Sequence, residues 1–129
     1  MLEGVARYFS LLSDPTRLRI MHTICSVEKS VTQIVRETGA AQTNVSRHLS
    51  TLYGAGVLSR RKSGNFIFYR VSDQTLIEIC RTACVHFAAR HESDEPAVAQ
   101  ALSLAEGFAA GEVAPGSAAG SADREAGSN

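Results

Sequence analysis

The stretch Val31–Leu58 constrains the fold more than any other part of the chain. Ser30 and Gln33 have the S-x-x-Q spacing of a capping box, which predicts a helix that begins directly after Ser30. That helix is short, because Gly39 suits the left-handed position that follows a helix end. A second helix is predicted from about Ala41–Gln42 to Tyr53, since apolar residues recur there at helical spacing, at Val45, Leu49 and Leu52. Two short helices joined by a glycine turn indicate a helix-turn-helix.

The face of the second helix opposite its apolar stripe is small, polar and cationic, and it contains no carboxylate. Such a face suits the major groove of DNA, where base edges offer hydrogen-bonding groups and phosphates repel acids. The alternative is an ordinary solvated surface helix, but such helices usually mix Glu with Lys. We therefore predict DNA contacts from Thr43, Asn44, Ser46, Arg47 and Ser50.

The net charge of the chain is zero, but its charges are unevenly distributed. Residues 1–92 hold 12 Lys and Arg against 7 Asp and Glu, a net +5, whereas residues 93–129 hold 1 against 6, a net −5. The range Thr38–Ser72 has no acid and five basic residues, which are Arg47, Arg60, Arg61, Lys62 and Arg70. A local basic surface of this kind is typical of a nucleic-acid binder.

A β-hairpin is predicted directly after the second helix. Val57–Lys62 and Phe66–Val71 have strand patterns, and the Gly-Asn pair between them is typical of a tight turn. A hairpin in this position is the wing of a winged helix, whose basic arm would follow the DNA backbone or the minor groove. The simpler alternative is that the charges only keep an edge strand from aggregating. We predict DNA contacts from Arg60, Arg61, Lys62 and Asn65.

The other segments predict further helices around this motif. We expect helices at Leu2–Leu12, at Pro15–Ser26 after an Asp14 cap, and from Ser72 or Asp73 to about His91. Residues 1–92 are expected to form a winged helix-turn-helix DNA-binding and dimerisation domain, 93–106 a short helix, and 107–129 a disordered Ala, Gly and Ser tail. The predicted fold class is mainly α with a small β-hairpin. No apolar run suits a membrane span and no secretory signal is visible, so we expect a cytoplasmic protein without a membrane partner.

Three cysteines are candidates for an effector site: Cys25, Cys80 and Cys84. Cys80 and Cys84 lie four residues apart on one helix face, where two thiolates share a soft ion more easily than they form a disulfide. Soft sulfur ligands select soft centres such as arsenite or antimonite. The alternative is structural, because free cysteine packs like a small hydrophobe and all three occupy inward positions. The sequence leaves both interpretations open, and it indicates no other cofactor.

Three segments, SLLSDPTRLRIM, TNVSRHLSTLYGAGVL and GNFIFYRVSD, resemble in order and spacing the ArsR/SmtB family of bacterial winged-helix repressors. The resemblance covers roughly residues 5–92. It implies a homodimer built on the first and last helices, an operator with two half-sites, and repression that ends when an inducer binds. It also implies that His48 lies on the DNA-reading helix beside Thr43, Ser46 and Arg47.

The sensing sites of that family match this chain only in part. The Cys-x-Cys of the arsenic- and cadmium-type site is absent, since Ser30-Val31-Thr32 occupies its position. The zinc-type site on the last helix is rejected, because only two of its four ligands are present, Asp73 and His86. The sulfide-responsive members of the family pair a cysteine in the second helix with one near the end of the last helix, and His22 and Ala88 occupy those positions here. Cys25 lies one turn after the first position and Cys84 about one turn before the second, and these two shifts compensate if the two helices pack antiparallel.

We therefore expect a sequence-specific, homodimeric repressor that binds double-stranded operator DNA and is not an enzyme. Its derepression is expected from a thiol-reactive effector, either an arsenite- or antimonite-type ion or a reactive sulfur species or oxidant that modifies the cysteines. The alternatives are a winged-helix protein-interaction module and a DNA-binding regulator whose cysteines are only structural. A thiol redox enzyme is disfavoured, because Cys-x-x-x-Cys lacks the usual Cys-x-x-Cys spacing. The sequence names neither the operator, the regulated genes nor the inducer.

Overall fold

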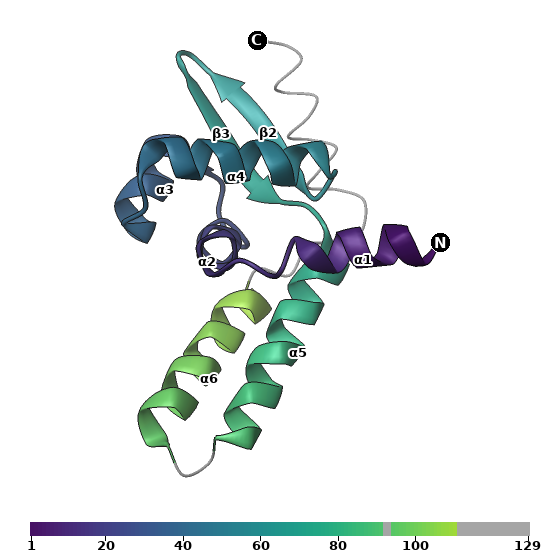
Figure 1. Ribbon diagram of the computed structural model, residues 1–129. Helices are drawn as coiled ribbons and strands as arrows, with labels where there is room; N and C mark the ends of the chain where they lie inside the picture. Colours follow the sequence, from purple (N-terminus) through teal and green to yellow (C-terminus); the bar gives the residue numbers. More distant parts are fainter. Residues whose placement is uncertain (92–93, 111–129) are drawn as a thin grey trace.

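The computed structural model describes residues 1–91 and 94–110, which form helices around a small sheet (Figure 1). The order along the chain is α1 (Leu2–Ser10), α2 (Pro15–Thr23), β1 (Lys29–Ser30), α3 (Val31–Thr38), α4 (Gln42–Gly54), β2 (Leu58–Ser63), β3 (Phe66–Val71), α5 (Gln74–Arg90) and α6 (Glu95–Ala110). This is the predicted winged helix-turn-helix, with α3 and α4 as the helix pair and β2–β3 as the wing. Among the described residues, no helix has the length and apolar character needed to cross a membrane.

The helix-turn-helix forms for the reasons that its sequence predicts. The Ser30 hydroxyl accepts a hydrogen bond from the Gln33 backbone N–H at 3.3 Å, and the Gln33 side chain accepts one from the Ser30 N–H at 2.8 Å. This capping box satisfies two N–H groups that have no partner within the helix. Gly39 ends α3 at a φ of 72°, in the left-handed region that favours glycine. The predicted apolar stripe of α4 is fully buried, at Val45, Leu49 and Leu52.

The sheet has three antiparallel strands in the order β1-β3-β2. The hairpin pairs Leu58 with Val71 at its base and Ser63 with Phe66 at its tip. The strand β1 was not predicted, because two residues are too few to show an alternating pattern. It joins the start of α3 to the wing, since Ser30 pairs with Phe68.

The helices α5 and α6 lie side by side and run in opposite directions (Figure 1). The expected short helix of 93–106 is too short, because α6 runs to Ala110, and the expected tail of 107–129 is wrong for residues 107–110. Phe108 is only 4% exposed and joins the hydrophobic core, aligned on α6 with Ala101 and Ala105, which are also buried. Small alanines at this spacing form a buried stripe that an Ala-rich composition conceals. Residues 111–129 lie outside the described residues.

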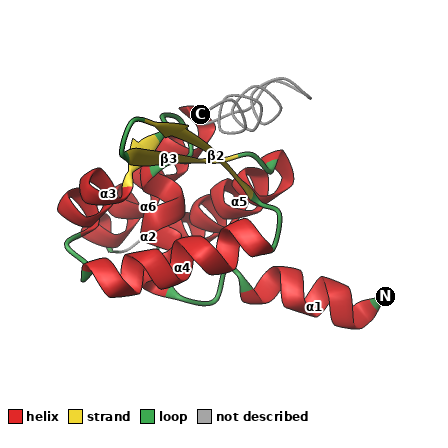
Figure 2. Cartoon of the chain, turned by 90° about the horizontal axis from the view of Figure 1, so that it is seen from above, coloured by secondary structure: helices red, strands yellow, loops and turns green. Residues whose placement is uncertain are grey.

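The first helix projects from the rest of the molecule (Figures 1 and 2). It has no buried residue, and its Leu2 and Phe9 side chains are 79% and 52% exposed. The Tyr8 hydroxyl, however, donates a hydrogen bond of 2.9 Å to the Asp73 carboxylate, which also caps α5. The first helix therefore leaves an apolar surface open while it is tied to the start of α5. Both early helices end sooner than predicted, α1 at Ser10 and α2 at Thr23.

Candidate nucleic-acid interface and cysteine region

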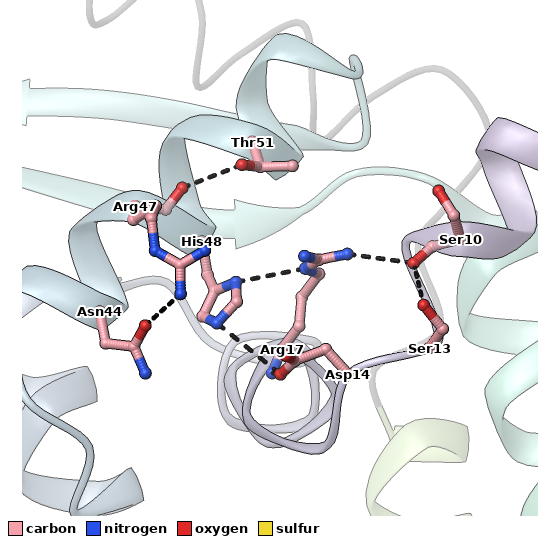
Figure 3. A network of polar contacts seen from close by, with 8 residues as sticks. All are labelled: Ser10, Ser13, Asp14, Arg17, Asn44, Arg47, His48 and Thr51. Atoms are coloured by element: carbon pink, nitrogen blue, oxygen red, sulfur yellow. Dashed lines mark hydrogen bonds and ion pairs between the residues drawn. The ribbon is translucent and has the colours of Figure 1, made fainter.

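The outer face of α4 is open to solvent in the positions that the sequence assigns to DNA contacts. Thr43, Ser46, Arg47 and Ser50 are exposed, and Asn44 is half-buried. The Arg47 guanidinium donates a hydrogen bond to the Asn44 side-chain oxygen, and both groups lie at the same end of the helix (Figure 3). No carboxylate lies on this helix, so the face keeps its positive character.

His48 takes a different position from its neighbour Arg47, because it is 1% exposed and points inward from α4. Its Nδ1 accepts a hydrogen bond of 3.3 Å from Arg17 Nε, and its Nε2 lies 3.7 Å from an oxygen of Asp14 (Figure 3). Arg17 also donates to the Ser10 carbonyl oxygen at 3.1 Å. This network joins α4 to the start of α2 and the end of α1, so His48 positions α4 rather than reaching outward from it.

The electrostatics of this network favour a neutral His48. Burial lowers the pKa of His48, although the nearby Asp14 carboxylate raises it in part. The Arg17 backbone N–H, which donates to Asp14 at the α2 cap, is the main reason that the pKa of Asp14 lies below its ordinary value. A neutral imidazole that accepts at Nδ1 carries its proton on Nε2, facing Asp14. The buried ring therefore accepts one hydrogen bond at Nδ1 and has a carboxylate near Nε2.

The basic residues of the wing differ in how they are held. The Arg60 guanidinium lies 3.9 Å from the centre of the Tyr53 ring, which fixes it against the end of α4. Arg61 forms an ion pair with Glu28, with Nε 3.0 Å from one carboxylate oxygen. Lys62 and Asn65 are exposed near the hairpin tip. The sequence interpretation missed Glu28, because it lies 33 residues before Arg61 and meets it only through the fold.

The three cysteines are free thiols at the junction of α2, α5 and α6. Cys80 and Cys84 line one cavity, whereas Cys25 is buried beside it and its Sγ donates to the carbonyl oxygens of His22 and Gly107, at 3.1 and 3.3 Å. Burial raises the pKa of all three thiols, and that of Cys80 rises to about 12 with a further contribution from Cys84 and Cys25. Within the described ranges, no group of three or more His, Cys, Asp or Glu residues is arranged to hold a metal ion.

His22 is a half-buried residue whose ring nitrogen Nε2 is fully buried, and the sequence interpretation gave it no role of its own. Its ring meets the edge of Phe108 at a centroid distance of 5.2 Å, and its Nε2 has no hydrogen-bond partner among the described residues. A Cβ at Gly107 would lie 2.2 Å from that nitrogen, so α6 seats on the His22 ring only because residue 107 is glycine. Burial lowers the pKa of His22. An unpartnered buried polar group costs about 1–3 kcal/mol, so the burial of His22 Nε2 offsets part of the stabilisation that the packing of Phe108 provides.

The chain is similar in sequence to known bacterial regulatory proteins. The model of the bacterial regulatory proteins of the arsR family matches residues 14–60, from the cap of α2 into β2. A probable mercury resistance operon repressor of Streptomyces lividans is 36% identical over 81 residues, which cover 63% of this chain and 65% of that protein, just under two thirds of its length. An uncharacterized HTH-type transcriptional regulator of Methanocaldococcus jannaschii is 34% identical over 80 residues, which cover 61% of this chain and 90% of that one.

Among solved structures, the homodimeric winged helix-turn-helix DNA-binding domain Mb0332 of Mycobacterium bovis superposes with a TM-score of 0.57 at 28% identity. The likeness covers 69% of this chain and 81% of that domain. The order from the α2 cap through the helix-turn-helix to the wing is common to the family match and the observed fold. The chain belongs to the arsR family of bacterial regulatory proteins and has the winged helix-turn-helix fold.

Proposed function

We propose that this protein is a homodimeric transcriptional repressor that binds operator DNA through α4 and the β2–β3 wing. The observation that carries the proposal is the outer face of α4, which is exposed, cationic and free of carboxylates beside a basic hairpin. Side chains of this kind supply hydrogen bonds to base edges, and the wing cations supply contacts to phosphates. The relatives named as transcriptional regulators support the same function.

A second copy of the chain is the partner that best fits the exposed apolar residues of α1 and α5. Phe9 on α1 and Val85 and Phe87 on α5 are each about half exposed, so both helices offer apolar side chains to an interface with a second chain. The Mycobacterium bovis domain of similar fold is a homodimer. A two-fold dimer would present two α4 helices to half-sites about one turn of DNA apart, roughly 34–36 Å.

The test is a selection of duplexes from a randomised pool, followed by affinity measurements of the full chain over a range of salt concentrations. We expect one enriched pseudo-palindromic sequence, a dimer by sedimentation, and a log affinity that falls linearly with log salt. The rival function is a protein-interaction winged helix. Weak binding without sequence preference and without salt dependence would favour that rival and contradict the proposal.

We further propose that a thiol-reactive effector ends repression by acting on the cysteine region. Cys80 and Cys84 line one cavity, so a soft arsenite- or antimonite-type ion or a reactive sulfur species reaches both from the same space. A relative named as a mercury resistance repressor is consistent with a thiophilic effector. Because burial raises the pKa of both thiols, ion binding must release protons and should strengthen as the pH rises.

The alternative is a DNA-binding regulator whose cysteines only pack. It is favoured by the raised pKa values of the thiols, because these keep the thiols protonated and therefore less reactive. The two are separated by intact mass spectrometry and operator release after arsenite, antimonite, persulfide or peroxide. A sensing role predicts that Cys80→Ser and Cys84→Ser bind operator normally but do not release it, and Cys25→Ser tests whether a third thiol takes part. Release like that of the unaltered protein in the Cys80→Ser/Cys84→Ser double variant would leave the cysteines a packing role.

A further inference from the structure

A cavity of about 500 Å³ lies between α2, α5, α6 and the C-terminal end of α3. Its walls include Leu18 of α2, Ile79 of α5, and Leu104 and Phe108 of α6. Protein interiors are close-packed and rarely leave voids larger than a water molecule, whereas small-molecule sites measure about 300–1,000 Å³. A space of this size, lined by four helices and partly open to solvent, has the dimensions of a binding site rather than of a packing defect.

The chemistry of the wall favours an uncharged occupant. The wall is formed mainly by apolar side chains, and the buried Cys80 and half-buried Cys84 lie among them, so loss of water disfavours the charged thiolates and raises the pKa of both thiols. Among the lining residues that the structure describes, the charged side chains are Arg19 and Glu37, and both are exposed. Glu37 is already paired with Lys29 at 2.9 Å. His22, Thr23 and Thr38 add polar atoms to a wall that is otherwise mainly apolar, so a polar group on the occupant would lie at the mouth or beside one of these side chains.

The space continues along the seam between α5 and α6. A second cavity of about 350 Å³ shares Ala83, Cys84 and Leu104 with the first and extends to Phe87. Two adjoining spaces with common walls suit a molecule longer than it is wide. The occupant of both would contact α6 over several turns and would reach Thr38, the last residue of α3, at the other end.

We propose that this cavity binds a small, uncharged, mainly apolar organic molecule, which is held by packing and not by a bond to the thiols. Burial of apolar surface provides the affinity, and the concave walls from α2, α5 and α6 provide the shape. Such a ligand would touch both the first helix of the helix-turn-helix and the helix that we assign to the dimer. A regulatory effect on DNA rests on the proposed function, whereas binding itself does not.

The probe for this site is N-phenyl-1-naphthylamine, an uncharged aromatic amine whose fluorescence rises in apolar surroundings, titrated into the full chain without DNA. We expect saturable binding of one probe per chain with a blue-shifted emission. Ala83→Trp, which fills the shared wall of the two cavities, should weaken binding by about tenfold or more. The matched control is Ala99→Trp, an exposed position of α6 outside both cavities, which should change the affinity less than about twofold.

Two further variants keep the test decisive. If Ala83→Trp loses its helical circular dichroism, Cys84→Leu replaces it as the filling variant, with the same expected loss. Cys80→Ala/Cys84→Ala keeps an apolar wall without thiols and should still bind the probe, and loss of binding there would contradict packing as the holding force. The absence of saturable binding, or equal binding by Ala83→Trp and Ala99→Trp, would overturn the site. Because no DNA is present, a failure of operator binding leaves these readouts unchanged.

Discussion

The outer face of α4 and the region under α6 both contain polar side chains, but these side chains are exposed to solvent on α4 and largely buried under α6. On α4, Arg47 and its neighbours Thr43, Ser46 and Ser50 are exposed, and the Arg47 side chain bonds to Asn44 of the same helix. Under α6, Cys25 and Cys80 are buried, His22 and Cys84 are half-buried, and the Cys25 thiol donates a hydrogen bond to the backbone carbonyl of Gly107 in α6. The first region can meet another molecule without changing the fold. In the second, any chemical event also disturbs the packing, which is what a coupled effector site requires.

The largest expected effect belongs to the packing of α6. Phe108→Ala should lower the free energy of unfolding by about 3–5 kcal/mol, because it removes a buried aromatic side chain and leaves a cavity. The measurement is urea denaturation followed by circular dichroism. Leu102→Ala, at a position of the same helix that is 45% exposed, is the control and should change stability by less than about 0.5 kcal/mol. Similar values for the two variants would show that α6 does not stabilise the domain.

On the outer face of α4, we expect a substitution to change operator affinity and to leave stability almost unchanged. Arg47→Ala should weaken operator binding by about 1–3 kcal/mol, because it removes a base or phosphate contact, and it should leave stability within about 0.5 kcal/mol of the unaltered protein. Fluorescence anisotropy with the selected duplex and urea denaturation measure the two quantities. Arg90→Ala, an exposed cation at the far end of α5, serves as the charge-matched control. An unchanged operator affinity in Arg47→Ala would remove α4 from the interface.

A smaller effect should separate the cations of the wing. Lys62→Gln should reduce the slope of log affinity against log salt by about one unit, because one phosphate contact is lost. Arg61→Gln should reduce it less, since its guanidinium forms an ion pair with Glu28 and Arg61 is less exposed than Lys62. Salt titrations of the selected and a random duplex give the slopes. Equal changes in the two variants would mean that Arg61 leaves Glu28 when DNA binds.

The smallest expected effect is the pH dependence of stability that arises where α6 packs on the His22 ring. Burial lowers the pKa of His22 in the folded chain below its ordinary 6.5, so the unfolded chain takes up a proton first as the pH falls. The contribution of a neutral His22 is therefore complete above about pH 6.5 and is lost as the pH falls through the lower folded value. Melting temperatures at pH 7.5 and 5.5 should differ less in His22→Leu than in the unaltered protein. An equal difference in both would assign the acid sensitivity to other groups, with His48 as the next candidate because its pKa is also lowered by burial.

The helix-turn-helix and the wing could be predicted because their signals are local. A capping box, a glycine after a helix end and an apolar stripe each depend on residues within one or two turns, and all three appear as predicted. The same local pattern placed Arg47 and Ser50 on the exposed face of α4. His48 was harder to place, because it lies at the edge of the stripe, and only contacts with α2 turn its ring inward.

The region under α6 shows what the sequence by itself did not determine. The order of elements, the basic stretch and the presence of three cysteines follow from the sequence alone, since each is a property of neighbouring residues. The extent of α6, the ion pair of Arg61 with Glu28, and the enclosure of His22 beside Gly107 were decided only by the tertiary structure. These features join residues 33 to 85 positions apart, and burial, which governs both the thiol pKa values and the cavity, arises only when such distant segments pack together.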